Sequence, residues 1–195
     1  MCGQYTLYTD RENQELQQIL EELRKERPGG ELRMEGDVFP NQAAPVLVEG
    51  EEGPKARVLT WGFPSFRGKG VLFNGRSETI LEKPLFRQAA LSRRCLVPAM
   101  GFYEWSQKKE RHLYGDGSMG LLYMAGLWSR FGGEDRFVIL TRPADALVSL
   151  VHPRMPVLVR REDRESWLKE EASIPRVLDA VARGLVQRDF GRWKE

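Results

Sequence analysis

The second residue of the chain is a cysteine, directly after Met1 in the stretch MCGQYTLYTD. Methionine is readily removed in front of a side chain as small as cysteine, which leaves an α-amine and a thiol on adjacent carbons. Ordinary pKa values of ~7.7–8.0 and ~8.5 leave both groups partly deprotonated near neutral pH. An amine condenses with an aldehyde to an imine, and the neighbouring thiol can close onto the same carbon as a thiazolidine ring. The alternative is that Cys2 is a small buried residue at the start of a first strand.

A second group of polar residues lies in the stretch FNGRSET at 73–79. Asn74 and Arg76 flank a glycine directly before a helical pattern that Ser77 can cap. A helix N-terminus favours phosphate, and an arginine beside it can add a bidentate contact. A plain turn with a surface arginine explains the same pattern.

Two candidates for proton transfer lie in apolar or rigid surroundings. Glu104 sits in the apolar run GFYEW at 101–105, where burial would raise its pKa toward that of a general acid or base. His152 comes at the end of a predicted helix, in a turn made rigid by prolines, and its ordinary pKa of ~6.5 suits a proton shuttle. An exposed glutamate on a half-buried strand and a histidine C-cap are the structural alternatives.

Together these residues predict a site for a carbonyl compound next to a phosphodiester. Cys2 would be the nucleophile, Asn74 an orienting group and Arg76 a phosphate anchor. Glu104 and His152 would move the protons.

The elements that must position these residues predict an α+β fold with a largely antiparallel sheet, in one domain over 1–195. An apolar stripe predicts a helix at 11–27, while 28–54 is expected to be loop with short extended pieces, and His112 is expected in a charged loop. Strands are predicted at 56–63, 94–107, 120–131, 135–142 and 154–159, and helices at 77–92 with a break at Pro84, 143–151, 161–170 and 174–185.

Composition excludes several classes of protein. The 195 residues carry a net charge of only +2, so any nucleic-acid site must come from local clustering of charge. A zinc site built from Cys2, Cys95, His112 and His152 lacks the usual closely spaced ligand pairs, so we expect neither a metal nor another cofactor. No secretory signal or membrane-spanning stretch is visible, which predicts a cytosolic protein, and we expect a monomer.

Seven motifs, in order along about 160 residues, resemble the SRAP (SOS-response-associated peptidase) family of abasic-site processing proteins. They are MCG at 1–3, PNQAAPV at 40–46, WGF at 61–63, FNGRSET at 73–79, RCLVPAMGFYEW at 94–105, MAGLW at 124–128 and VHPRMPVLV at 151–159.

The resemblance implies a fold of curved antiparallel sheets, barrel-like with flanking helices, around a basic DNA channel. It implies binding of single-stranded DNA, or of single-strand/double-strand junctions, at abasic sites. Cys2 would form a thiazolidine with the ring-opened sugar after loss of Met1, and Asn74 would orient it. Glu104 would be the acid/base in ring opening and imine formation, and His152 would act in proton transfer and in reversal.

The DNA-binding candidates that the resemblance implies include Arg76, and Phe66 for packing near the bases. Arg67 and Lys69 add local positive charge beside Phe66. Trp105 and Arg154 lie in the same motifs as Glu104 and His152 and complete the set.

The chain departs from the family pattern at Gln4, usually arginine, at Gly75, often alanine, and at Met100, often polar or acidic. The Gln4 departure leaves one DNA-facing charge in doubt. Two further hypotheses stay open: an N-terminal-nucleophile peptidase that uses the Cys2 thiol, and a DNA-binding module in which Cys2 is structural.

Overall fold

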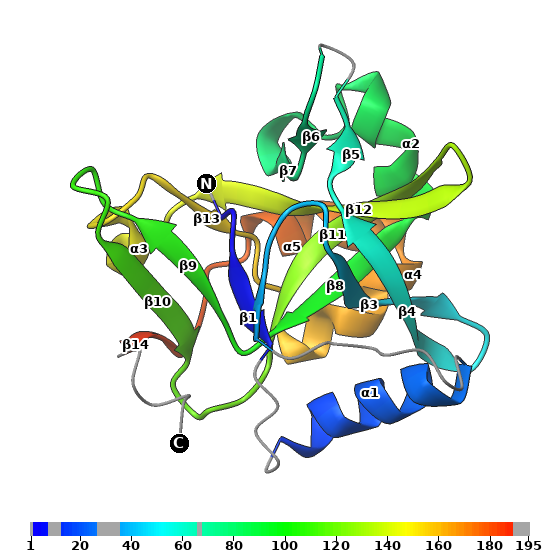
Figure 1. The fold of residues 1–195 in the computed structure, drawn as a ribbon, viewed down its shortest axis with the longest axis horizontal. Helices are drawn as coiled ribbons and strands as arrows, with labels where there is room; N and C mark the ends of the chain where they lie inside the picture. The colour runs from blue at the N-terminus through cyan, green and yellow to red at the C-terminus, as the bar shows by residue number, and fades with distance from the viewer. Residues whose placement is uncertain (1, 8–12, 27–35, 66–67, 189–195) are drawn as a thin grey trace.

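A computed structural model describes residues 2–7, 13–26, 36–65 and 68–188 (Figure 1). Its centre is a closed barrel of five strands, with neighbours in the order β11, β8, β3, β4, β12 and back to β11. All neighbours are antiparallel except β4 and β12, so the barrel is mixed and the expected α+β, barrel-like fold is confirmed. The strands are β3 (Ala43–Gly50), β4 (Gly53–Trp61), β8 (Arg94–Ala99), β11 (Leu122–Phe131) and β12 (Glu134–Pro143).

A second, antiparallel sheet lies beside the barrel, to the left in Figure 1. The chain passes directly from β8 of the barrel through Met100 into β9 of this sheet, which couples the two. Its order is β14 (Leu185–Arg188), β10 (Arg111–Asp116), β9 (Gly101–Trp105), β1 (Tyr5–Leu7) and β2 (Gly36–Val38).

Short strands extend β12 at one end of the barrel. Strand β7 (Asn74–Arg76) pairs with it in parallel and β13 (Arg154–Pro156) pairs antiparallel, so the FNGRSET and VHPRMP motifs share one support. Strands β5 (Phe63–Pro64) and β6 (Val71–Leu72) form a separate hairpin.

Helices cover the barrel from outside. The α1 helix (Gln14–Glu26) turns Leu16, Ile19, Leu20 and Leu23 inward, as the stripe predicts, and lies along the lower edge in Figure 1. Pro84 restarts the chain as α2 (Pro84–Ser92) after a turn of 3-10 helix at Ser77–Thr79. The remaining helices are α3 (Ala146–Ser149), α4 (Arg164–Lys169) and α5 (Ile174–Asp179), and none of the helices in the described ranges is long and apolar enough to cross a membrane.

Some predictions of secondary structure are wrong. The 28–54 region contains the eight-residue strand β3, whose residues 44–48 are buried. Strand β8 pairs β3 only at Leu47 and Val48, so Pro45 needs no amide on that side and is tolerated. The helix expected at 174–185 ends at Asp179, and β14 follows after Gly184, which has a φ of 68°. His112 lies in β10 and not in a loop.

Candidate functional site

Cys2 lies three residues before β1 and is fully buried. The Asn74 side chain on β7 donates a hydrogen bond to the Cys2 carbonyl oxygen at 2.9 Å. Burial, followed by the nearby Glu104 carboxylate, raises the pKa of the Cys2 thiol far above its usual range. Asn74 therefore holds the backbone of Cys2, and the buried thiol is neutral.

The pairing of β1 with β9 brings Glu104 to the N-terminal residues. Tyr5 lies opposite Phe102, and the Gln4 carbonyl accepts a hydrogen bond from the Tyr103 amide at 3.0 Å. Because the strands run antiparallel, the chain before Tyr5 continues alongside Glu104. Glu104 is fully buried, and burial raises the pKa of its carboxyl to about 7. It can therefore give or take a proton near neutral pH.

His152 approaches Glu104 from the loop between α3 and β13. Its Nδ1 lies 3.5 Å from Glu104 Oε2 and 2.9 Å from the Arg154 carbonyl oxygen. Partial burial lowers the pKa of His152, so the ring is mostly neutral at pH 7. The predicted partners Cys2, Asn74, Glu104 and His152 thus meet in one place, although they come from four separate segments.

The two arginines of the DNA-binding set differ in their surroundings. Arg76 ends β7 and is exposed. Arg154 is mostly buried and donates two hydrogen bonds to Glu78, at 2.6 and 2.9 Å, and one to the Thr141 carbonyl. This pairing lowers the pKa of Glu78 to about 2. Arg154 therefore ties β13 to the residues after β7, and its contact with DNA stays a prediction.

The capping prediction for Ser77 is wrong. The short 3-10 helix has Arg76 at its N-cap position with no side-chain cap, and the Ser77 hydroxyl lies 3.3 Å from Glu78. With only three residues it offers no helix dipole for a phosphate.

The other DNA-binding candidates are only partly described. Lys69 is exposed beyond the β5 strand, and Trp105 is half-buried at the end of β9. Phe66 and Arg67 lie outside the described residues. Among those that are described, no group of three or more His, Cys, Asp or Glu side chains is placed to bind a metal ion.

Comparison with known proteins decides the family. The model of the SOS response associated peptidase (SRAP) family matches residues 1–190. This chain belongs to the SRAP family. The abasic site processing protein YedK of Escherichia coli is 26% identical over 99% of this chain and 90% of its own. YoaM of Bacillus subtilis, also named an abasic site processing protein, is 29% identical over 93% of this chain and 85% of its own.

Solved structures carry the same fold. A crystal structure of a protein from Bordetella bronchiseptica superposes with a TM-score of 0.75, at 23% identity, over 95% of this chain and 98% of that one. A crystal structure of a protein from Bacteroides thetaiotaomicron gives the same TM-score at 21% identity, and the match covers 95% of this chain and 90% of that one.

Gln4, where the SRAP motif usually has arginine, is buried in this chain rather than facing solvent. Its side-chain amide donates to Asp37 Oδ2 at 2.6 Å, and the Tyr103 hydroxyl donates to Asp37 Oδ1 at 3.1 Å. Asp37 on β2 therefore links a residue two positions from Cys2 to the residue next to Glu104. No sequence motif indicated a role for Asp37, because it falls in the region that was expected to be loop.

We expect Asp37→Ala to lower the free energy of unfolding by about 1–3 kcal/mol, because the buried Gln4 amide loses its acceptor. Asp37→Asn keeps an acceptor oxygen and should cost clearly less. Urea unfolding of the three proteins measures this, and equal losses in both variants would contradict the linkage.

His112 is a second residue near the site that its position in the sequence did not indicate. It lies directly opposite Glu104 in the β9–β10 pair, so the two side chains share a face at roughly 5 Å between Cβ atoms. Within the described ranges, its buried Nε2 has no hydrogen-bond partner. Pairing of GFYEW with RHLYG in a hairpin would have revealed this neighbour.

Proposed function

We propose that the protein captures abasic sites in single-stranded DNA, or at single-strand/double-strand junctions, by forming a covalent thiazolidine through Cys2 once Met1 has been removed. The observation that carries this proposal is the buried Glu104–His152 pair beside an N-terminal cysteine that Asn74 holds in place. The names of the curated relatives support the choice of abasic sites as substrate.

The first step is attack by the neutral α-amine of Cys2 on C1′ of the ring-opened sugar. Glu104, with its raised pKa, is protonated often enough near pH 7 to give a proton to the sugar oxygen. The C–N bond forms, the hydroxyl leaves as water, and an imine remains. His152 is close enough to Glu104 to return its proton.

The second step closes the ring. The Cys2 sulfur adds to the imine carbon, its proton passes through Glu104 to the imine nitrogen, and a thiazolidine results. Overall, one aldehyde and one aminothiol give one thiazolidine ring and one water, so no oxidant is needed. An imine that does not close can hydrolyse or undergo β-elimination, which gives weak strand cleavage, and the reverse steps release the protein.

The raised pKa of the Cys2 thiol favours a mechanism in which the amine attacks first over a peptidase mechanism. A peptidase needs the thiolate as its nucleophile, and a cysteine lowers its thiol pKa for that purpose. Here burial raises the pKa of the Cys2 thiol, so the amine is the better attacking group.

A denaturing gel tests the proposal. The processed protein is incubated with an oligonucleotide that carries one natural abasic site, and with a matched one whose site is a stable tetrahydrofuran without an aldehyde. We expect a slow-migrating covalent band with the natural site only. Absence of that band, with loss of Met1 verified by intact mass, would overturn the proposal.

A further inference from the structure

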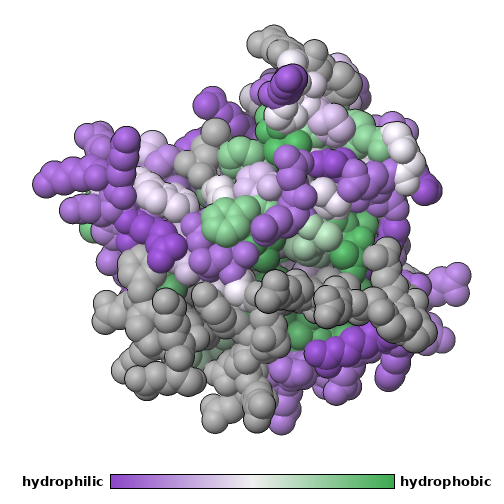
Figure 2. All heavy atoms as spheres, in the orientation of Figure 1, coloured by the Kyte–Doolittle hydropathy of each residue, from purple (hydrophilic) through white to green (hydrophobic). Residues whose placement is uncertain are grey.

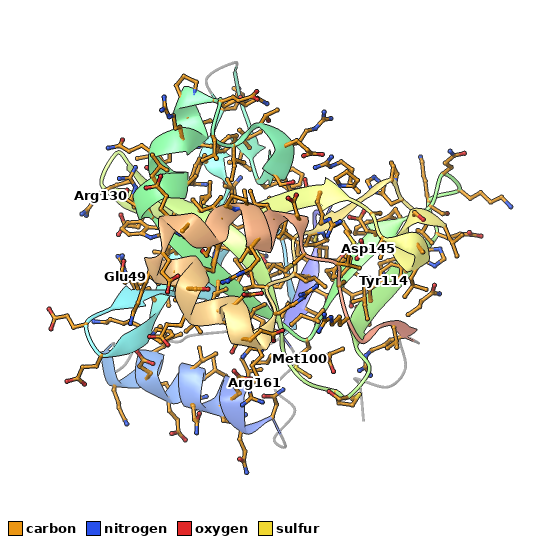
Figure 3. All side chains as sticks on the ribbon, turned by 180° about the vertical axis from the view of Figure 1, so that it is seen from behind. Glu49, Met100, Tyr114, Arg130, Asp145 and Arg161 are labelled. Carbon is orange, nitrogen blue, oxygen red and sulfur yellow. The ribbon has the colours of Figure 1, made fainter. Side chains whose placement is uncertain are left out.

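A hollow of about 340 Å³ lies on the face that Figure 3 shows from behind, where Arg161 is labelled beside α4. Its walls come from the turn between β10 and β11, the segment after β13 and the segment between α5 and β14. None of the described residues that line it belongs to the candidate site or to the DNA-binding set. The hydrophilic cluster over the β9–β10 turn, at the left of Figure 2, contributes none of them either. Its volume is at the lower end of the range of small-ligand pockets.

Four arginines line the hollow: Arg160, Arg161, Arg164 and Arg183. Two of them are held by neighbouring groups. The Arg164 guanidinium lies over the Tyr123 ring, with 3.9 Å from its Cζ to the ring centroid, and its Nη1 donates to Glu15 Oε1 at 2.7 Å. Arg160 Nη2 donates to the Val181 carbonyl oxygen at 3.3 Å. These two guanidinium groups therefore need little ordering when a ligand binds.

Both held arginines keep a donor that is buried without an acceptor. Among the residues that the structure describes, the Nε atoms of Arg160 and Arg164 have no hydrogen-bond partner. An unpaired buried N–H group costs about 1–3 kcal/mol, so such groups are rare. Because Glu15 takes only Nη1 of Arg164, Nε and Nη2 still present the edge that binds a phosphate through two parallel hydrogen bonds. A phosphate in the hollow would supply the missing acceptors.

The rest of the lining suits a ligand larger than phosphate. Two further carboxylates, Asp116 and Glu162, would repel a bare anion but can accept hydrogen bonds from hydroxyl groups. Leu121, Leu158 and Val159 add buried apolar side chains, against which a short carbon skeleton can pack. Hydroxyl groups, a carbon skeleton and a phosphate occur together in a phosphorylated sugar.

We propose that this hollow binds a phosphorylated sugar, with its phosphate on Arg160, Arg164 and Arg183 and its hydroxyl groups on Asp116 and Glu162. The binding is non-covalent. It goes beyond the proposed function and does not depend on it, because the two sites have no described residue in common.

Isothermal titration calorimetry of the full chain tests this with ribose 5-phosphate, ribose and inorganic phosphate as separate probes. We expect ribose 5-phosphate to bind at least about tenfold more tightly than either of the others, because only it engages both the arginines and the carboxylates. A 5′-phosphorylated dinucleotide is then added as a competitor. Displacement would identify a nucleic-acid end as the source of the sugar phosphate, and lack of displacement a free one.

Arg160→Gln should weaken binding of ribose 5-phosphate about tenfold, because a charge-assisted hydrogen bond is lost. Arg183→Gln should weaken it by a smaller factor, and its folding is not at issue because the side chain is exposed. Arg87→Gln replaces an exposed arginine on α2 outside the hollow; it is the matched control and should change nothing.

Glu162→Ala separates the two halves of the ligand. It should lower the ratio of the affinity for ribose 5-phosphate to that for inorganic phosphate, because a hydroxyl acceptor and a repelling charge are removed together. An unchanged or higher ratio would contradict the role of the carboxylates.

The site would be overturned if ribose 5-phosphate did not bind, if inorganic phosphate bound as tightly, or if Arg183→Gln behaved like Arg87→Gln. Crosslinking to a natural abasic site is measured separately by the gel and should be unchanged in Arg183→Gln. Loss of crosslinking in that variant would show that the hollow is not separate from the candidate site.

Discussion

Replacing Cys2 by serine should abolish the stable crosslink and leave weak strand cleavage at the abasic site. Serine keeps the α-amine, so the imine still forms, but its hydroxyl cannot close the ring as the sulfur does. The imine then hydrolyses or eliminates. A denaturing gel resolves the two products, and borohydride added during the reaction should trap the Cys2→Ser protein on the DNA.

Cys95→Ala provides the matched control. Cys95 is the other thiol of the chain, is equally buried, and has no amine beside it. This variant should crosslink like the unchanged protein. A stable crosslink in Cys2→Ser, or its loss in Cys95→Ala, would contradict the assignment of the reacting sulfur.

Replacing Glu104 by glutamine should slow crosslinking by about 10²–10⁴-fold, the usual contribution of a general acid or base. It should also change the pH profile. In the unchanged protein the rate needs a neutral amine and a protonated Glu104, so it rises toward neutrality and falls again above the Glu104 pKa of about 7. Glu104→Gln should lose the fall at high pH. Single-turnover rates between pH 5.5 and 9 measure both effects.

The same variant should be more stable than the unchanged protein at high pH. The folded pKa of Glu104 is raised from 4.5 to about 7, so the folded state holds this proton more tightly than the unfolded state. This tighter proton binding stabilises the folded state by about 3 kcal/mol below about pH 4.5, and the stabilisation is lost as the pH rises through about 7. Glutamine has no proton to lose.

Thermal unfolding at pH 5 and pH 8 checks this. Glu104→Gln should gain stability relative to the unchanged protein only at pH 8, while Glu82→Gln, an exposed control, should behave alike at both. If Glu104→Gln were equally destabilised at both pH values, the pKa of the Glu104 carboxyl would not be raised in the folded protein. Among the described residues, the titratable groups that contact, share a strand face with, or are electrostatically coupled to Glu104 include Cys2, His112, Tyr114 and His152.

The sequence was sufficient to predict which residues gather at the candidate site but not what surrounds them. Cys2 and Glu104 stood out because each is an unusual residue type for its position, although the pattern alone left a structural alternative open for both. The same argument could not find Asp37, which has an ordinary residue type in a stretch rich in Gly, Pro and Glu. Its importance comes from the pairing of β1 with β2, a contact between segments some thirty residues apart.

Local patterns also failed where long-range pairing decides the structure. The apolar run in β3 lacks alternation because both faces are buried in a closed barrel, and Pro45 made the run resemble a loop. The helix predicted at 174–185 stops at Asp179, and the 185–188 segment becomes a strand because β10 offers it an edge. His112 was misjudged for the same reason, since its charged neighbours hid the strand that places it opposite Glu104.

Tandem mass spectrometry of the crosslinked N-terminal peptide can show directly which atoms of Cys2 react with the sugar. The crosslink to a natural abasic site is digested with nuclease and protease after iodoacetamide treatment. A thiazolidine at Cys2 predicts a peptide that begins at Cys2, carries the sugar remnant with loss of one water, and is not alkylated at its sulfur. An alkylated Cys2 with the sugar attached to a lysine such as Lys69 would contradict it.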